Sequence, residues 1–247
     1  MDRFEWIATA AFGLEGVVAR ELARLGLDAK AENGGARFFG TFEDAFRANL
    51  HARCADRILL VMGRFEARSF EELFEGVRAL PWEDFIGERT RFPVNGKCAR
   101  SQLMSVRDCQ SITKKAIVER LRGRYRTDWF VEDAETVSID VALHGDIAQL
   151  TLDASGTALN RRGYRTWNGE APLRETLAAA LVTLSPWRPG MPLHDPMCGT
   201  GTLMIEAAMR MAHRAPGLTR EFAIESWRNM PTEAFGDIRE QARAEFD

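Results

Sequence analysis

The chain has 247 residues, of which 45% are hydrophobic and 28% charged, a balance typical of a globular protein with one large or two modest domains. No apolar run is long enough to cross a membrane, and the first residues lack a signal-peptide layout, so we expect a cytoplasmic protein. Its four cysteines and four histidines show no ligand spacing, which argues against a metal site or a disulfide framework.

The net charge of −3 conceals an uneven distribution of charged residues. Residues 89–126 carry 11 basic and 2 acidic side chains, whereas the segments on either side are both acidic. A concentrated positive stretch is typical of a surface that meets a phosphate backbone. The alternative is a solvated helix face that needs no partner. We expect nucleic acid to be the partner.

The first 65 residues predict a ferredoxin-like unit. An apolar stripe that includes Val18 and Leu22 indicates a helix, and Asn33-Gly34-Gly35 is a strong hairpin signal. The order of elements is β-α-β-β-α-β. The expected elements are a strand at 4–8, a helix at 13–25, strands at 30–31 and 36–39, a helix at 41–50 and a strand at 57–65.

A second unit follows these elements. Ser69 and Glu72 form a capping-box pattern that opens a helix running to about Leu80. After a short extended stretch at 91–97 comes a strongly basic helix at 105–121. Alternating apolar residues on both sides of a Gly145-Asp146 turn then predict a β-hairpin formed by 137–143 and 147–152.

The third unit begins near residue 159 with a basic loop. A helix is predicted from 171 to 184, with Pro172 in its first turn. Three further prolines precede a short predicted strand that ends at Asp195. Beyond the glycine-rich segment after Asp195, helices are expected at 203–212 and 231–246.

The segment from Asp195 to Thr202 is the most informative motif of the chain. Gly199 and Gly201 permit a tight turn and close approach of a ligand to the backbone, and the first amides of the following helix point into that turn. The pattern predicts a small-molecule site on a doubly wound sheet. The dinucleotide fingerprint would need a third glycine where Met204 stands. An ordinary glycine-rich turn is the alternative.

DPMCGTGTLMIEAA in this segment resembles the first motif of class I S-adenosylmethionine (SAM)-dependent methyltransferases, in the version found in RNA and DNA amino-methyltransferases. Four segments together resemble bacterial THUMP-domain rRNA guanine-N2 methyltransferases of the 23S large-subunit type, and they span essentially the whole chain. They are residues 8–26, 110–121, 159–182 and 195–218.

The resemblance implies an α+β N-terminal part followed by the start of an α/β Rossmann-like methyltransferase domain. Residues 1–65 would form the ferredoxin-like domain, 66–155 an RNA-binding THUMP domain, and 156–247 the beginning of the SAM-dependent domain. It also implies transfer of a methyl group from SAM to the exocyclic N2 of a guanine in structured RNA.

The resemblance also implies two sets of site residues in this sequence. The residues expected to line the SAM site are Asp195, Pro196, Met197, Cys198, Gly199, Thr200 and Gly201, with Pro172 and Glu175 nearby. The residues expected to contact RNA are Lys97, Arg100, Lys114, Lys115, Arg161, Arg162 and Arg165.

One departure from the family pattern is clear. The family's catalytic motif is Asn/Asp-Pro-Pro-Tyr/Phe, and the nine prolines of this chain include no Pro-Pro pair. We therefore expect the chain to be the N-terminal portion of a longer enzyme, inactive alone, with its catalytic residues further along. The alternatives are a related tRNA guanine-N2 methyltransferase, a non-catalytic THUMP RNA-binding module, and an unrelated α/β protein with a chance glycine pattern.

Overall fold

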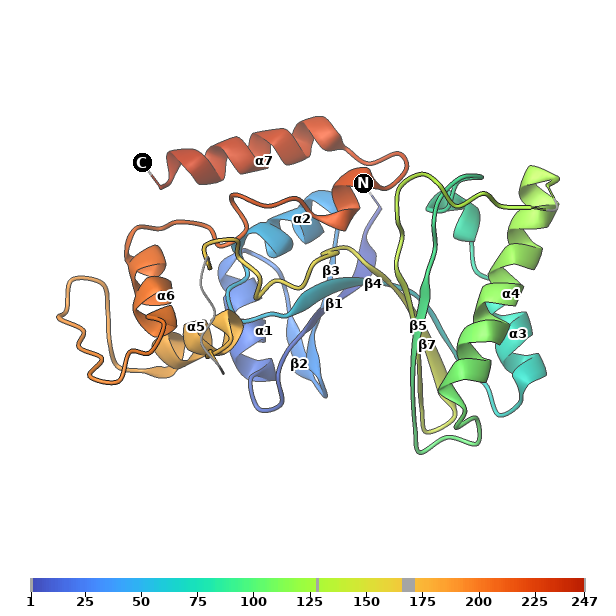
Figure 1. Cartoon of the computed structure of the whole chain (residues 1–247), viewed down its shortest axis with the longest axis horizontal. Coiled ribbons are helices and arrows are strands. Elements are labelled where there is room, and N and C mark those ends of the chain that lie inside the picture. Colours follow the sequence, from blue (N-terminus) through green and yellow to red (C-terminus); the bar gives the residue numbers. More distant parts are fainter. Residues whose placement is uncertain (1, 128, 166–171, 247) are drawn as a thin grey trace. The chain divides into compact units, whose positions relative to one another are not determined.

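The computed structural model describes residues 2–127, 129–165 and 172–246, and these fall into two compact units (Figure 1). The first unit combines residues 1–58, 154–225 and 231–247, and the second combines residues 59–153 and 226–230. Strand β4 (Arg57–Glu66) begins in the first unit and continues in the second. The division into three domains stays a prediction, because compactness alone does not set domain limits.

The N-terminal elements of the first unit form as predicted, with ends shifted by one or two residues. Strand β3 is antiparallel to both β1 and β2, with Phe4 opposite Gly40 and Lys30 opposite Arg37. Thr41 caps the second helix, accepting a hydrogen bond from the Asp44 amide. The elements are β1 (Phe4–Thr9), α1 (Glu15–Arg24), β2 (Lys30–Glu32), β3 (Gly35–Gly40) and α2 (Phe42–His51).

Helix α7 (Thr232–Ala244) packs against α2 in the first unit (Figure 1). The ring of Phe46 on α2 stacks on Phe235 of α7 with centroids 4.5 Å apart, and Phe222 meets it edge-on at 5.6 Å. Phe222 directly precedes a 3₁₀ turn (Ala223–Ser226). The C-terminal segment is therefore part of the core that the ferredoxin-like elements build, which the sequence patterns did not predict.

The second unit is a four-stranded sheet with two helices on one face (Figure 1). Its strand order is β4-β7-β6-β5, antiparallel except for the parallel β5–β6 pair. Trp82, in a 3₁₀ turn (Trp82–Asp84), is fully buried in its core. The remaining elements are α3 (Phe70–Arg78), β5 (Val94–Ala99), α4 (Val106–Tyr125), β6 (Ile139–His144) and β7 (Ile147–Asp153).

The region after Asp153 contributes helices and no strand among the described residues. Helix α5 (Glu175–Leu184) and helix α6 (Thr202–Met211) confirm two predicted helices, but α5 begins only at Glu175, so the prediction that Pro172 lies in its first turn is wrong. The expected start at Ala171 lies outside the described residues. The predicted strand ending at Asp195 is wrong, because residues 192–195 are irregular. A strand needs a neighbour for its backbone hydrogen bonds, and proline at 192 and 196 removes two donors.

None of the helices in the described ranges is both long and apolar enough to cross a membrane.

Candidate cofactor turn and its polar support

The predicted cofactor segment forms a tight, exposed turn between α5 and α6. The Asp195 carboxylate accepts a hydrogen bond from the Met197 amide at 3.1 Å, and the Gly201 amide donates to the Cys198 carbonyl at 2.8 Å. Gly199 and Gly201 have φ angles of 53° and 72°, in the left-handed region that favours glycine. A Cβ on either glycine would meet nothing within 4 Å, so backbone conformation rather than crowding calls for glycine.

The turn leaves the start of α6 open for an anionic group. Gly201 is the N-cap of α6, and a glycine has no side-chain oxygen to accept hydrogen bonds from the first helical amides. The aligned peptides place partial positive charge at this end of the helix. The turn therefore fits the carboxylate-bearing amino-acid end of SAM.

A small apolar core supports the turn from behind. Buried Val182 and Trp187 pack with Ala207, and Leu193 and Leu203 cover them in part. A cavity of about 290 Å³ opens beside Asp195 in this region. Its lining residues are Leu181, Val182, Ser185, Trp187, Leu193, His194, Asp195 and Leu203.

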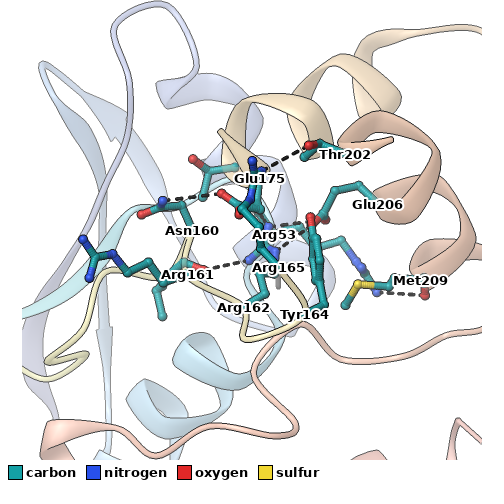
Figure 2. Close-up of polar contacts among 12 residues, drawn as sticks. Arg53, Asn160, Arg161, Arg162, Tyr164, Arg165, Glu175, Thr202, Glu206 and Met209 are labelled. Atoms are coloured by element: carbon teal, nitrogen blue, oxygen red, sulfur yellow. Dashed lines mark hydrogen bonds and ion pairs between the residues drawn. The ribbon is translucent and has the colours of Figure 1, made fainter. Parts of the chain in front are cut away.

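Arg165 connects the start of α5 to the start of α6 (Figure 2). Its Nε donates to Glu175 at 2.9 Å, and its Nη2 donates to the Leu173 carbonyl at 3.0 Å and to the Thr202 hydroxyl at 3.1 Å. Asn160 also donates to Glu175, at 3.5 Å. Thr202, the first residue of α6, was not among the predicted site residues, although its place directly after Gly201 is a usable signal.

Arg162 lies in the interior rather than on an RNA-facing surface. Its guanidinium pairs with Glu206 of α6 at 2.8 Å and donates to the carbonyls of Leu159 and Arg53. The hydroxyl of Tyr164 donates to the same Glu206 oxygen at 3.1 Å (Figure 2). We therefore correct the prediction that Arg162 contacts RNA, since a buried, fully paired guanidinium is out of reach of a phosphate.

Burial shifts the ionisation of the groups around this ion pair. Desolvation, and then the Glu206 carboxylate, raise the pKa of Tyr164 well above its usual range. Burial likewise raises the pKa of Glu21 on α1, although its two oxygens accept from the Arg53 and Cys54 amides. Arg53 in turn donates to the Arg214 carbonyl at 2.7 Å. The loop before β4, α1 and the segment after α6 are thus held by one polar network.

The remaining residues predicted for RNA and for SAM are distributed as follows. Arg161 is exposed, and Pro172 is half-buried close to the buried Glu175. A cavity of about 510 Å³ brings together members of both predicted sets. Its lining residues are Asn160, Arg161, Arg162, Gly163, Arg165, Pro172, Leu173, Arg174 and Glu175.

In the second unit, the predicted RNA contacts lie on α4, in β5 and directly after β5. Lys97, Arg100 and Lys115 are exposed, whereas Lys114 is paired with Glu132 at 2.6 Å and lies 4.7 Å from the centre of the Phe92 ring. The basic stretch therefore offers fewer unpaired cations than its composition suggests. We find no group of three or more candidate metal ligands among the described side chains.

Family models match three consecutive parts of the chain. A model described as RlmL ferredoxin-like domain matches residues 5–59, a THUMP domain model matches residues 67–153, and an RMKL-like methyltransferase domain model matches residues 162–247. The chain therefore contains an RlmL-type ferredoxin-like domain, a THUMP domain and an RMKL-like methyltransferase domain. The first two matches agree with the ferredoxin-like and THUMP folds expected from the sequence.

Related proteins are similar to nearly the whole chain. YpsC of Bacillus subtilis (strain 168), whose name gives RNA methyltransferase as a provisional activity, is 47% identical over 229 residues, which are 92% of this chain and 60% of YpsC. The ribosomal RNA large subunit methyltransferase K/L of Photobacterium profundum is 37% identical, over 96% of this chain and 34% of that protein. The chain therefore spans less than two thirds of the length of each of these relatives.

Solved structures of related proteins share the fold. SMU.472, named as a methyltransferase by provisional assignment and crystallised in complex with SAH, is 42% identical, with a TM-score of 0.95. The match covers 100% of this chain and 66% of that one. SAH is the product that SAM leaves after methyl transfer, so a relative of the same fold binds this class of cofactor.

Proposed function

We propose that the whole protein is a cytoplasmic SAM-dependent methyltransferase that modifies the exocyclic N2 of a guanine in 23S rRNA. The observation that carries the proposal is the exposed Gly199–Gly201 turn at the uncapped start of α6. The SAH complex of SMU.472 supports the cofactor, and the name of the Photobacterium relative supports rRNA. The guanine N2 target comes from the sequence resemblance.

The residues of this chain would bind and orient rather than react. The amides at the start of α6 would receive the carboxylate of SAM, and Asp195 keeps the turn in shape through the Met197 amide. When bound, SAM supplies an electrophilic methyl group. The exposed cations of α4 and β5 would hold structured RNA through its phosphates. The family's catalytic motif is absent from these 247 residues, so we expect them to bind without transferring methyl groups.

The test uses the full-length gene product with methyl-labelled SAM and protein-free rRNA or tRNA, followed by nucleoside mass spectrometry. We expect N2-methylguanosine in rRNA. N2-methylguanosine in tRNA alone would favour the tRNA alternative. RNA binding without transfer to either substrate would favour a non-catalytic module.

The turn itself is tested by Gly201→Val. A valine strains the positive φ and places methyl groups where the cofactor would approach, so SAM binding measured by calorimetry should be lost while RNA binding persists. Gly190→Val is the matched control, because Gly190 has a φ of 91° in open space but precedes the turn. Equal SAM affinity in both variants would contradict the assignment of the turn.

A further inference from the structure

Arg165 occupies a position that neither an RNA contact nor a simple surface ion pair explains. Its side chain is 16% exposed and that of Glu175 is 7% exposed, so the pair is largely removed from water. The guanidinium reaches the first residue of α5 through Glu175 and the first residue of α6 through Thr202. One side chain thus spans two helix starts that are 27 residues apart in the sequence.

The charge of Arg165 is only partly balanced. Each helix start carries partial positive charge, which disfavours a cation there, and Glu175 offsets part of that cost. The remaining nitrogen, Nη1, is buried and has no hydrogen-bond partner among the residues that the structure describes. A buried donor without a hydrogen bond costs free energy of folding, and such groups in native proteins call for an explanation. A carboxylate arriving at the open start of α6 would lower this cost.

Thr202 links Arg165 directly to the glycine turn. It follows Gly201 directly, is buried, and its hydroxyl lies 3.0 Å from that of Thr200. The two glycines have no side chains that could hold their own conformation. The hydrogen bond from Arg165 is therefore a contact that fixes where the first amides of α6 point.

We propose that Arg165 is a positioning residue for the amino-acid end of the cofactor: it holds Thr202 and the glycine turn in place and draws the cofactor carboxylate to the start of α6. This inference rests on the proposed function and replaces the predicted RNA role of Arg165. It requires no contact between Arg165 and the adenosine part of the cofactor.

The test compares two ligands that differ at that end only. SAH carries the amino-acid group, whereas 5′-methylthioadenosine has the same adenosine and thioether without it. In calorimetry with the full-length protein, Arg165→Gln should weaken SAH about tenfold or more and leave 5′-methylthioadenosine unchanged. Arg165→Lys, which keeps the charge but not the forked geometry, should restore part of the SAH affinity. Arg24→Gln, an exposed arginine on α1, is the control and should change neither affinity.

Thr202→Val provides a second variant that keeps the arginine and the side-chain shape. It should weaken SAH selectively, and RNA binding should keep its salt dependence in all these variants. Equal weakening of both ligands would show a merely structural role and overturn the inference, as would unchanged SAH affinity in Arg165→Gln. A wild-type protein that binds neither ligand would instead refute the proposed function and the inference with it.

Discussion

Arg162 and Glu206 form an ion pair at 2.8 Å in which the two side chains are 1% and 0% exposed. The pair fastens the loop after Leu159 to the middle of α6, four residues beyond Thr202. Since removing one partner leaves a buried charge unpaired, the pair is structurally critical even if the intact pair adds little net stability.

The first prediction follows from this pair. Arg162→Ala should lower the free energy of unfolding by about 3–5 kcal/mol, because Glu206 is left buried without its cation. Urea denaturation measures the change. Arg161→Ala, at the exposed neighbouring position, should stay within about 0.5 kcal/mol of wild type. Similar effects of the two substitutions would contradict the buried pairing.

A second prediction concerns the contact of the segment after α6 with α2. Gly217 donates to the Leu50 carbonyl at 2.9 Å, and a Cβ on Gly217 would lie 3.0 Å from Leu50 Cα and 2.6 Å from a ring carbon of Phe222. Gly217→Ala should therefore cost about 1–3 kcal/mol in thermal or urea unfolding. Gly236→Ala, at an open site within α7, should instead stabilise by up to about 1 kcal/mol. The same sign for both would show that the close approach is absent.

A third prediction separates the two adjacent lysines of α4. Lys115 is exposed, whereas Lys114 already pairs with Glu132. Lys115→Ala should weaken binding to structured RNA and reduce the slope of log affinity against log salt by about one, and Lys114→Ala should do less. Filter-binding titrations at several salt concentrations measure both slopes. Lys30→Ala, an exposed lysine in β2, is the control. An unchanged slope for Lys115→Ala would remove α4 from the RNA interface.

A fourth prediction concerns thiol reactivity and pH. Burial, and then the neighbouring Cys98, raise the pKa of the Cys109 thiol to about 12, whereas Cys198 in the glycine turn is exposed. An alkylating reagent at pH 8 should therefore modify Cys198 rapidly and Cys109 slowly, as mass spectrometry of the digested protein can show.

The raised pKa of Cys109 also predicts how the stability of the protein changes with pH. The unfolded thiol ionises near pH 8.5, whereas folded Cys109 keeps its proton to about pH 12. The stability that this thiol contributes is complete below pH 8.5 and declines as the pH rises toward 12. A Cys109→Ala variant should lose less stability than wild type over that interval. The free energy of unfolding of both proteins would be measured by urea titration at the two ends of this pH interval. Equal losses of stability in wild type and Cys109→Ala would contradict the raised pKa.

The sequence alone predicted most of the local structure, because periodicity and capping are local signals. The Thr41 cap was not singled out, yet the helix after it was predicted, and the Ser69–Glu72 capping box formed as expected. The motif from Asp195 to Thr202 predicted a turn followed by a helix, and the positive φ angles of Gly199 and Gly201 agree. The prediction of a strand before Asp195 was wrong, because a strand depends on a neighbouring strand that local residues do not reveal.

Tertiary structure decided which charged residues face solvent. In the sequence, Arg161, Arg162 and Arg165 look alike as members of one basic loop. The fold exposes the first, buries the second against Glu206 and places the third between two helix starts. Glu206 is 44 residues from its partner Arg162 along the chain, and Glu175 is 10 residues from its partner Arg165. The sequence by itself determined that cations would be present and where helices begin, but only folding brought each cation to its partner, because burial and pairing depend on distant segments meeting in space.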